Sequence, residues 1–246
     1  MHDWARYALC VPWLQDPVQQ WSPLAYRRTD EIRRQCNAQA IPVINPVDRL
    51  IYAAKCEGAR RIGSTGLRVP RVARIEDPER FREDFYGIDL PLVIREDWGH
   101  GKPMLRVDTR EEARAIDLSA FKRPLAVEFV EVADPDDRIY RKYRYVAAGY
   151  TGISLSLHAT PNWLTRGTQS LETPRIIAEE AAYVARPDPN HEALQRAREA
   201  LELDFVAFDY GYDRDGQVVV WETNPYPTIH LRKSPPMRPA AKRMSE

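Results

Sequence analysis

Three oxygen-bearing side chains near the C-terminal end of the sequence could bind a metal ion. Asp209 ends one apolar run, and Glu222 and Asn224 lie at the end of the next. The Asp215-Gly216 pair between these runs is typical of a β-hairpin turn. Because residues two apart on a strand share a face, Glu222 and Asn224 are expected on one side of the hairpin. Carboxylate and amide oxygens are ligands that suit Mg²⁺.

The register of this hairpin decides which residue faces Asp209. A turn that pairs position 213 with 216 places Asp209 opposite Val220. A turn that pairs position 214 with 217 places Asp209 opposite Glu222. Both registers put Asp209 on the face that carries Glu222, so we expect the two carboxylates to converge.

Two converging carboxylates need a cation nearby. Apolar residues fill both faces of the runs 205–208 and 218–221, which indicates buried strands. At a separation of about 4 Å and an effective dielectric constant of about 20, two such charges repel by about 4 kcal/mol. The pattern therefore predicts a divalent cation. The alternative, in which the acids are merely solvated on an exposed hairpin, stays open.

The composition excludes several classes of protein. Lys plus Arg equals Asp plus Glu, at 36 residues each, so the net charge argues for neither a nucleic-acid nor a membrane partner. No apolar run is long enough for a membrane span and the N-terminus lacks a signal-peptide core, so a cytoplasmic protein is expected. Cys10, Cys36 and Cys56 show no disulfide or zinc pattern and are interpreted as small apolar residues.

The elements that must position the acidic residues mix helices and strands without regular βαβ alternation, which predicts an α+β fold. Thr109, followed three residues later by Glu112, predicts a helix that begins with a capping box. Helices are expected at 29–39, 46–63, 109–116 and within 187–203; strands at 41–45, 71–75, 90–95, 125–132, 141–148, 204–212 and 217–223; and an irregular segment at 152–173.

The order of these features resembles the ATP-grasp superfamily, which includes D-alanine:D-alanine ligases, glutathione synthetases and ribosomal-protein glutamate ligases. The segment FDYGYDRDGQVVVWETNPYP is similar to the family's closing signature. The resemblance implies that Asp209, Glu222 and Asn224 bind Mg²⁺, with Mn²⁺ as an alternative. It extends over about residues 41–230 and implies two α+β lobes that clasp ATP.

The resemblance also implies a division of the chain. Residues 1–45 would form a partial, shortened N-terminal region, and residues 46–232 the ATP-grasp domain. Within that domain, the small lobe would span about 70–127 and the large lobe about 128–232. Residues 233–246 are expected to form a C-terminal tail rich in Pro, Lys and Arg.

Two further segments resemble the family's nucleotide-binding strands. LAVEFVEV is similar to the hinge strand, which implies that the backbone of Glu128, Phe129 and Val130 binds adenine and that Glu131 reaches the ribose. RKYRYVAAG is similar to the next strand. In that strand Arg144 would face the phosphates, and Lys142 would share its face as a second catalytic residue.

The remaining implied contacts are with the phosphates of ATP. PLVIREDWGHGK resembles the small-lobe strand and its glycine loop, so Arg95, Gly99 and Gly101 are implied as ATP-binding residues. The family usually has Lys where Arg95 stands, and Arg binds phosphate with a different, two-pronged geometry. Lys55 lies at the matching distance before Pro70 and is implied as another phosphate contact.

Together these features predict a Mg-ATP-dependent carboxylate–amine ligase that acts through an acyl-phosphate intermediate. Its partners would be small-molecule or peptide carboxylates and amines. Two alternatives stay open: a kinase-like phosphotransfer enzyme with the same ATP site, and a non-catalytic nucleotide-binding sensor. The oligomeric state also stays open, with a homodimer as one option.

Overall fold

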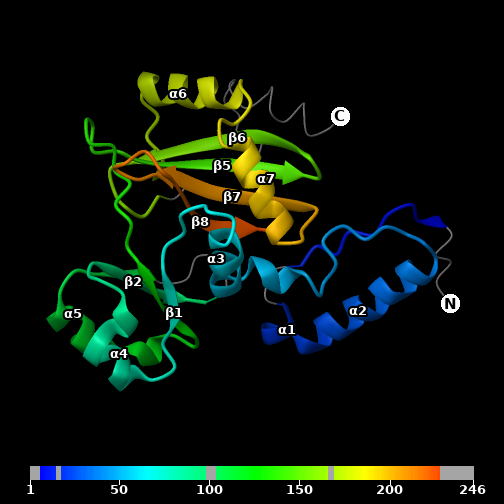
Figure 1. Ribbon diagram of the computed structural model, residues 1–246, viewed down its shortest axis with the longest axis horizontal. Coiled ribbons are helices and arrows are strands. Elements are labelled where there is room, and N and C mark those ends of the chain that lie inside the picture. The colour runs from blue at the N-terminus through cyan, green and yellow to red at the C-terminus, as the bar shows by residue number, and fades with distance from the viewer. Residues whose placement is uncertain (1–5, 15–17, 98–103, 166–168, 228–246) are drawn as a thin grey trace.

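The computed structural model describes residues 6–14, 18–97, 104–165 and 169–227. It contains two four-stranded antiparallel sheets, and Figure 1 shows them as separate groups of strands with a helical N-terminal arm to one side. The α+β class predicted from the sequence is confirmed. In the described part of the chain, no helix combines the length and the apolar character that crossing a membrane requires.

The first sheet is covered by helices on one face. Its strands follow the order β1-β4-β2-β3, all antiparallel to their neighbours. A core that includes Phe81, Leu92 and Ile94 joins this face to the short helices. The elements are β1 (Val72–Arg74), α4 (Pro78–Asp84), η3 (Phe85–Gly87), β2 (Leu92–Glu96), β3 (Met104–Val107), α5 (Arg110–Ala115), η4 (Leu118–Ala120) and β4 (Pro124–Glu128).

The predicted capping box at the start of α5 is confirmed. Thr109 Oγ1 accepts a hydrogen bond from Glu112 N at 3.1 Å, and Glu112 Oε2 accepts one from Thr109 N at 3.1 Å. Replacing Thr109 with Ala removes one acceptor and should lower the free energy of unfolding by about 1 kcal/mol. Urea denaturation measures this change. Thr109→Ser keeps the hydroxyl and should match the wild type; equal stability of all three proteins would contradict the assignment.

The second sheet carries its helices on one face as well. Its strands follow the order β6-β5-β7-β8, again antiparallel. The Tyr145 hydroxyl forms a hydrogen bond with His191 Nδ1 of α7, at 2.8 Å. Tyr143, on the same face, packs against Tyr183 of α6 with 5.0 Å between the ring centroids. Glu222 of β8 contacts Arg95 of the first sheet. The elements are β5 (Tyr140–Ala148), β6 (Thr151–Thr160), α6 (Pro174–Val184), α7 (His191–Ala200), β7 (Phe205–Tyr212) and β8 (Val218–Asn224).

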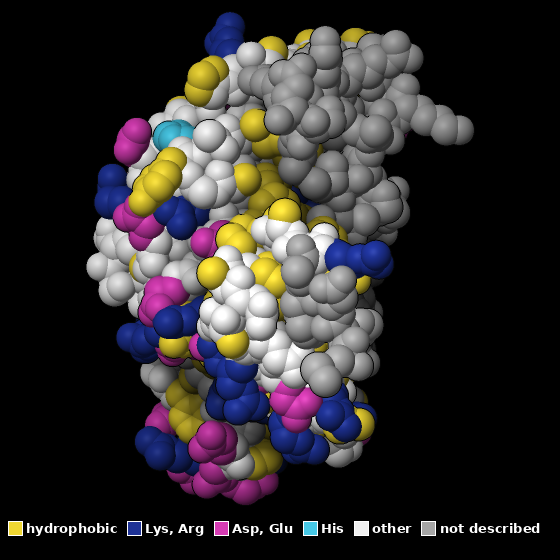
Figure 2. Space-filling view, turned by 90° about the vertical axis from the view of Figure 1, so that its right-hand side faces the viewer, with side chains coloured by type: hydrophobic (Ala, Val, Ile, Leu, Met, Phe, Trp, Pro, Cys, Tyr) yellow, Lys and Arg dark blue, Asp and Glu magenta, His cyan; other side chains and the backbone are white. Residues whose placement is uncertain are grey.

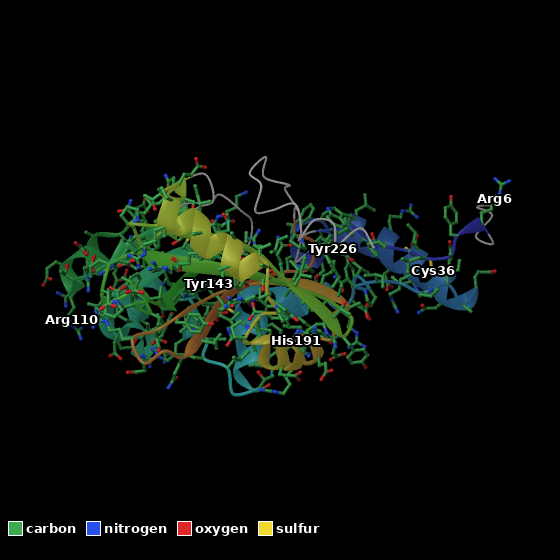
Figure 3. The ribbon with its side chains drawn as sticks, turned by 90° about the horizontal axis from the view of Figure 1, so that it is seen from above. Arg6, Cys36, Arg110, Tyr143, His191 and Tyr226 are labelled. Carbon is green, nitrogen blue, oxygen red and sulfur yellow. The ribbon has the colours of Figure 1, made fainter. Side chains whose placement is uncertain are left out.

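The N-terminal arm extends away from both sheets. It consists of α1 (Val18–Trp21) and α2 (Pro23–Ala38). Figure 3 shows Cys36 of α2 toward one end of the molecule and Arg110 of α5 at the other, with Tyr143 between them. The helix predicted at 29–39 is confirmed and begins earlier, at Pro23, because proline is favoured in the first turn of a helix.

The single helix predicted at 46–63 is wrong. The chain forms η2 (Leu50–Ala53) and α3 (Lys55–Gly63), separated by Ala54 with an extended ψ of 148°. An extended residue ends the hydrogen-bonded series of a helix, so a new N-terminus begins at Lys55. The break places Lys55 at the start of α3 instead of in the middle of a longer helix.

Three other local predictions need correction. The strand predicted at 41–45 is reduced to one bridge between Cys10 and Val43, and Asn45 leaves the extended conformation with a left-handed φ of 49°. The strand predicted at 125–132 ends at Glu128. The segment predicted to be irregular contains β6, whose Ile-Ser-Leu-Ser-Leu sequence is the alternating pattern of a strand. The helix α6 was not predicted.

Candidate active site

A β-bulge at Trp221 brings Asp209 opposite Glu222. Neither predicted turn register is present, because Asp213 N donates to Gln217 O at 3.0 Å around a three-residue turn. This register alone would set Asp209 against Trp221. The bulge inserts Trp221 as an extra residue on β8, which moves the register by one and pairs Asp209 with Glu222. The two carboxylates therefore share a face, as the sequence predicted.

Two basic residues of β5 hold Asp209. Arg144 lies directly opposite Asp209, and its Nε and Nη2 donate to the two carboxylate oxygens at 2.6 and 2.8 Å. Lys142 Nζ lies 3.2 Å from Asp209 Oδ2. Burial raises the pKa of the Asp209 carboxyl, but the charges and hydrogen bonds of Lys142 and Arg144 outweigh it and hold the pKa well below its usual range. Asp209 is therefore ionised.

Glu222 is the point where the two sheets and α3 meet. Lys55 Nζ lies 3.5 Å from Glu222 Oε1, and Arg95 Nη2 of β2 lies 3.9 Å from the same oxygen. A narrow pocket of about 40 Å³ separates the sheets at this point. The residues that line it include Lys55, Val72, Arg95, Val127, Trp221 and Glu222.

The site has a surplus of positive charge. Among the described residues, four cations form ion pairs with the two carboxylates, which leaves a formal charge of +4 − 2 = +2; they are Lys55, Arg95, Lys142 and Arg144. The expected counter-charge for the acids is therefore supplied by the chain itself. Figure 2 shows Lys and Arg interspersed with Asp and Glu on the face that it presents. Such a surplus favours an anionic ligand.

The donor set at the hairpin fits a metal ion that arrives with its own ligands. Asn224 follows Glu222 by two residues, and its Oδ1 accepts a hydrogen bond from Tyr226 N at 2.9 Å. Among the described residues, no group of three or more His, Cys, Asp and Glu side chains could hold an ion. Two carboxylates and an amide suit Mg²⁺, which commonly keeps waters and phosphate oxygens in its shell.

The segment predicted to bind the nucleoside lines a second, larger pocket. Phe129, Val130 and Glu131 border a pocket of about 450 Å³ beside the β7–β8 turn. The N–H groups of Glu128 and Phe129 already donate to Arg71 O and Pro91 O, at 2.8 and 3.3 Å. Adenine would therefore have to meet this segment through other backbone groups. The predicted residues Gly99 and Gly101 lie outside the described part of the chain.

Trp221 is a residue of this site that sequence reasoning missed. A Cβ at Gly211 would lie 2.5 Å from Trp221 Cη2, so glycine leaves the space that the indole occupies beside the pocket. The contact between Gly211 and Trp221 could not be predicted, because the bulge at Trp221 has no sequence signal of its own.

Comparison with known proteins places this arrangement among solved structures. No protein-family model and no curated protein matches the sequence. The D-alanine–D-alanine ligase from Bacillus anthracis complexed with ATP matches at a TM-score of 0.59 and 12% identity, over 98% of this chain and 74% of that chain. The macrocyclase MdnC from Microcystis aeruginosa, bound with precursor peptide MdnA, matches at a TM-score of 0.56 and 16% identity. The match covers 95% of this chain and 72% of that chain.

A third similar structure is the ATP-grasp ligase PsnB complexed with a minimal precursor, Mg and ADP. It matches at a TM-score of 0.57 and 15% identity, over 98% of this chain and 78% of that chain. The described chain therefore has the ATP-grasp fold, as the resemblance implied. At these identities the comparison establishes the fold, and activity has to be argued from the site.

Proposed function

We propose that this protein is a Mg-ATP-dependent carboxylate–amine ligase that works through an acyl-phosphate intermediate. One observation carries the proposal. Asp209 and Glu222 are brought side by side by a bulge, and four cations from α3, β2 and β5 converge on them. This arrangement offers carboxylates for a divalent ion and cations for phosphate in one place, on a fold shared with ATP-dependent ligases.

The two pockets suggest how the nucleotide lies. We place the phosphates at Lys55 and Arg95, which line the narrow pocket, and at Lys142 and Arg144 beside Asp209. The nucleoside would lie in the larger pocket beside Phe129 and Glu131. The phosphate end is too narrow for a nucleotide as it stands, since about 40 Å³ holds little more than a water molecule. The sheets would therefore separate when ATP enters. The lobe boundaries of about 70–127 and 128–232 remain part of this proposal.

The proposed chemistry depends on charge placement. The substrate carboxylate attacks the γ-phosphorus and ADP leaves; an amine then attacks the acyl carbon, phosphate leaves, and the amine proton passes to solvent. Mg²⁺, bound by Asp209, Glu222 and the Asn224 amide, would neutralise phosphate charge. Arg144 and Lys142 orient the phosphoryl oxygens and stabilise the charge that develops on them. No side-chain nucleophile is needed. MdnC is solved with a precursor peptide and PsnB with a minimal precursor, which supports a peptide or small-molecule carboxylate here.

Calorimetry and product analysis test this function. ATP titrated into the protein with Mg²⁺ should bind more tightly than ATP titrated with EDTA. ADP should be released when carboxylates and amines are supplied together, and mass spectrometry should find a new amide. A stable phosphate ester instead would assign a kinase. Metal-dependent binding without any turnover over a broad substrate panel would assign a sensor, and no ATP binding would refute the proposal.

Replacing Arg144 should lower the rate of ATP turnover. Arg144→Gln removes the two donors to Asp209 and, in the proposed complex, a cation beside the phosphates. We expect kcat for ADP release to fall by about 100-fold or more, the usual effect of removing one such donor. Arg196→Gln, on the exposed side of α7, is the matched control and should keep full activity. Equal turnover in the two variants would contradict a catalytic role for Arg144.

A further inference from the structure

Two arginines converge on one buried carboxylate at the edge of the cleft that lies away from the predicted hinge. Arg74 Nη2 lies 3.1 Å and Arg123 Nη2 lies 3.6 Å from Asp97 Oδ2. The Asp97 side chain is 1% exposed, whereas those of Arg74 and Arg123 are 40% and 34% exposed. We call these three residues the Asp97 cluster. Its carboxylate is inside, and its guanidinium groups reach solvent.

The fold fixes where the Asp97 cluster stands. Arg74 and Arg95 both lie opposite Leu125 of β4, so both are on the face of the first sheet that meets the second sheet. Asp97 follows Arg95 by two residues. Its backbone N–H donates a hydrogen bond to Arg123 O at 3.0 Å. The carboxylate of Glu96 accepts from Lys122 N and Arg123 N at 2.6 and 3.1 Å, which anchors the backbone of Arg123.

The charges within the Asp97 cluster do not balance. One carboxylate faces two guanidinium groups, and within the described part of the chain neither Asp97 oxygen receives a hydrogen bond of good geometry. A buried ion pair kept for stability alone normally satisfies its oxygens, because desolvating a carboxylate is expensive. Among the described residues of the Asp97 cluster, one carboxylate holds two cations in place, which leaves a formal charge of +2 − 1 = +1. Two converging guanidinium groups are suited to a planar carboxylate.

The Asp97 cluster adjoins the proposed phosphate site without belonging to it. Arg95 contacts Glu222, and Asp97 lies two residues further along the chain, about 7 Å away in an extended strand. The hinge residues lie at the other end of β4. A molecule bound at Arg74 and Arg123 would thus lie beyond the phosphates, where the second reactant of a ligase has to approach.

We propose that Arg74 and Arg123, held by Asp97, form a second anion site that binds a carboxylate group of the substrate. This inference rests on the proposed function for the identity of the substrate. It assigns the substrate class as an anionic molecule with a carboxylate besides the one that reacts, such as a dicarboxylic acid or an acidic peptide. The same geometry could bind a phosphate of the nucleotide, and the experiment below separates the two sources.

Cys56 offers a reporter that involves no nucleotide. Its thiol lies against the Arg74 guanidinium, and burial together with the Asp97 charge raises the pKa of this thiol. Iodoacetate carries a carboxylate and alkylates thiols, whereas iodoacetamide is its neutral analogue. In both reactions a sulfur–carbon bond forms, iodide leaves and the thiol proton passes to the buffer. The ratio of the two rates at Cys56 therefore reports attraction of a carboxylate to the Asp97 cluster.

The expected result is a higher iodoacetate-to-iodoacetamide ratio at Cys56 than at Cys10, by about fivefold at low salt. Peptide mass spectrometry of the full-length protein assigns the alkylated residues. Succinate should lower the ratio at Cys56 in the wild type. Arg74→Gln and Arg123→Gln should each lower it toward the value at Cys10, whereas Arg80→Gln, on exposed α4, should leave it unchanged.

Three results would overturn the inference. The first is a ratio at Cys56 no higher than at Cys10. The second is a raised ratio that survives both Arg74→Gln and Arg123→Gln. The third is a ratio at Cys56 that Mg-ADP lowers but succinate does not, which would make the Asp97 cluster part of the nucleotide site. Because the labelling requires no ATP turnover, failure of the proposed ligase activity would appear in the ADP-release assay and not here.

Discussion

Replacing Asp209 with Asn should reduce ATP turnover by about 100-fold or more while the protein stays folded. Asp209 is the residue on which the proposed metal site and the basic residues both depend, since it faces Glu222 on one side and Arg144 and Lys142 on the other. The amide keeps the size of the side chain but removes the charge that a divalent ion needs. Losing a metal ligand removes several kcal/mol of transition-state stabilisation.

The affinity for ATP without metal should change in the opposite direction. In the wild type, Asp209 occupies Arg144 and Lys142 and competes with any phosphate for them. In Asp209→Asn these cations lose their anionic partner, so metal-free ATP should bind at least as tightly as in the wild type. The gain in affinity that Mg²⁺ gives the wild type should disappear. A misfolded variant would lose both forms of binding, so the pair of titrations distinguishes a site defect from a folding defect.

Asp136→Asn is the matched control for this experiment. Asp136 is an exposed residue between β4 and β5 and lies outside both pockets. The same chemical change there should alter neither ADP release nor the Mg²⁺ dependence of ATP binding. If Asp209→Asn turned over ATP at the rate of Asp136→Asn, Asp209 would not be a metal ligand and the proposed function would lose its main support.

The hairpin illustrates what could be predicted from the sequence. The apolar runs and the Asp-Gly turn signal are local, so both strands and the hairpin that joins them could be derived without any tertiary information. The register could not. It depends on a three-residue turn and on a bulge at Trp221, and the two shifts compensate each other. The prediction that the acids converge is therefore confirmed although neither turn considered for it is present.

The electrostatic partners of the acids are a matter of tertiary structure. Lys55 reaches Glu222 only because the chain breaks at Ala54 and starts a new helix there. Arg95 reaches the same carboxylate only because the face of the first sheet that carries no helices lies against the second sheet. No periodicity in the sequence expresses these approaches. The sequence thus indicated which residues carry charge in the site but not that the cations outnumber the two carboxylates there.

Asn45→Ala should lower the free energy of unfolding by about 3–5 kcal/mol. The Asn45 side chain is fully buried and satisfies four backbone groups. Its Nδ2 donates to Phe205 O at 2.5 Å and Pro225 O at 2.9 Å, and its Oδ1 accepts from Asp204 N at 2.8 Å and Phe205 N at 3.0 Å. Alanine would leave these four backbone groups without their side-chain partners, and the contact with Pro225 O is fully buried. The left-handed φ of 49° also suits Asn better than Ala.

Three companion variants divide this loss into its causes when urea denaturation is compared. Asn45→Asp keeps the acceptor oxygens but sets a buried carboxylate against the carbonyl oxygens of Phe205 and Pro225, so it should be at least as unstable as Asn45→Ala. Asn45→Gly removes the backbone strain at the left-handed φ without restoring any hydrogen bond. Relative to Asn45→Ala, it should therefore recover only the smaller, conformational part of the lost free energy of unfolding. Asn37→Ala, on the exposed side of α2, should stay within about 0.5 kcal/mol of the wild type.

The position of Asn45 links this stability to the site. Phe205 begins β7 and Pro225 follows Asn224, so one amide joins the outer ends of the two strands that carry Asp209 and Glu222. Asn45→Ala should therefore weaken Mg²⁺-dependent ATP binding even at temperatures where the variant is fully folded. Calorimetry with and without Mg²⁺ measures that effect. If the folded variant bound Mg-ATP as tightly as the wild type, the strand ends would be held by other contacts and Asn45 would serve stability alone.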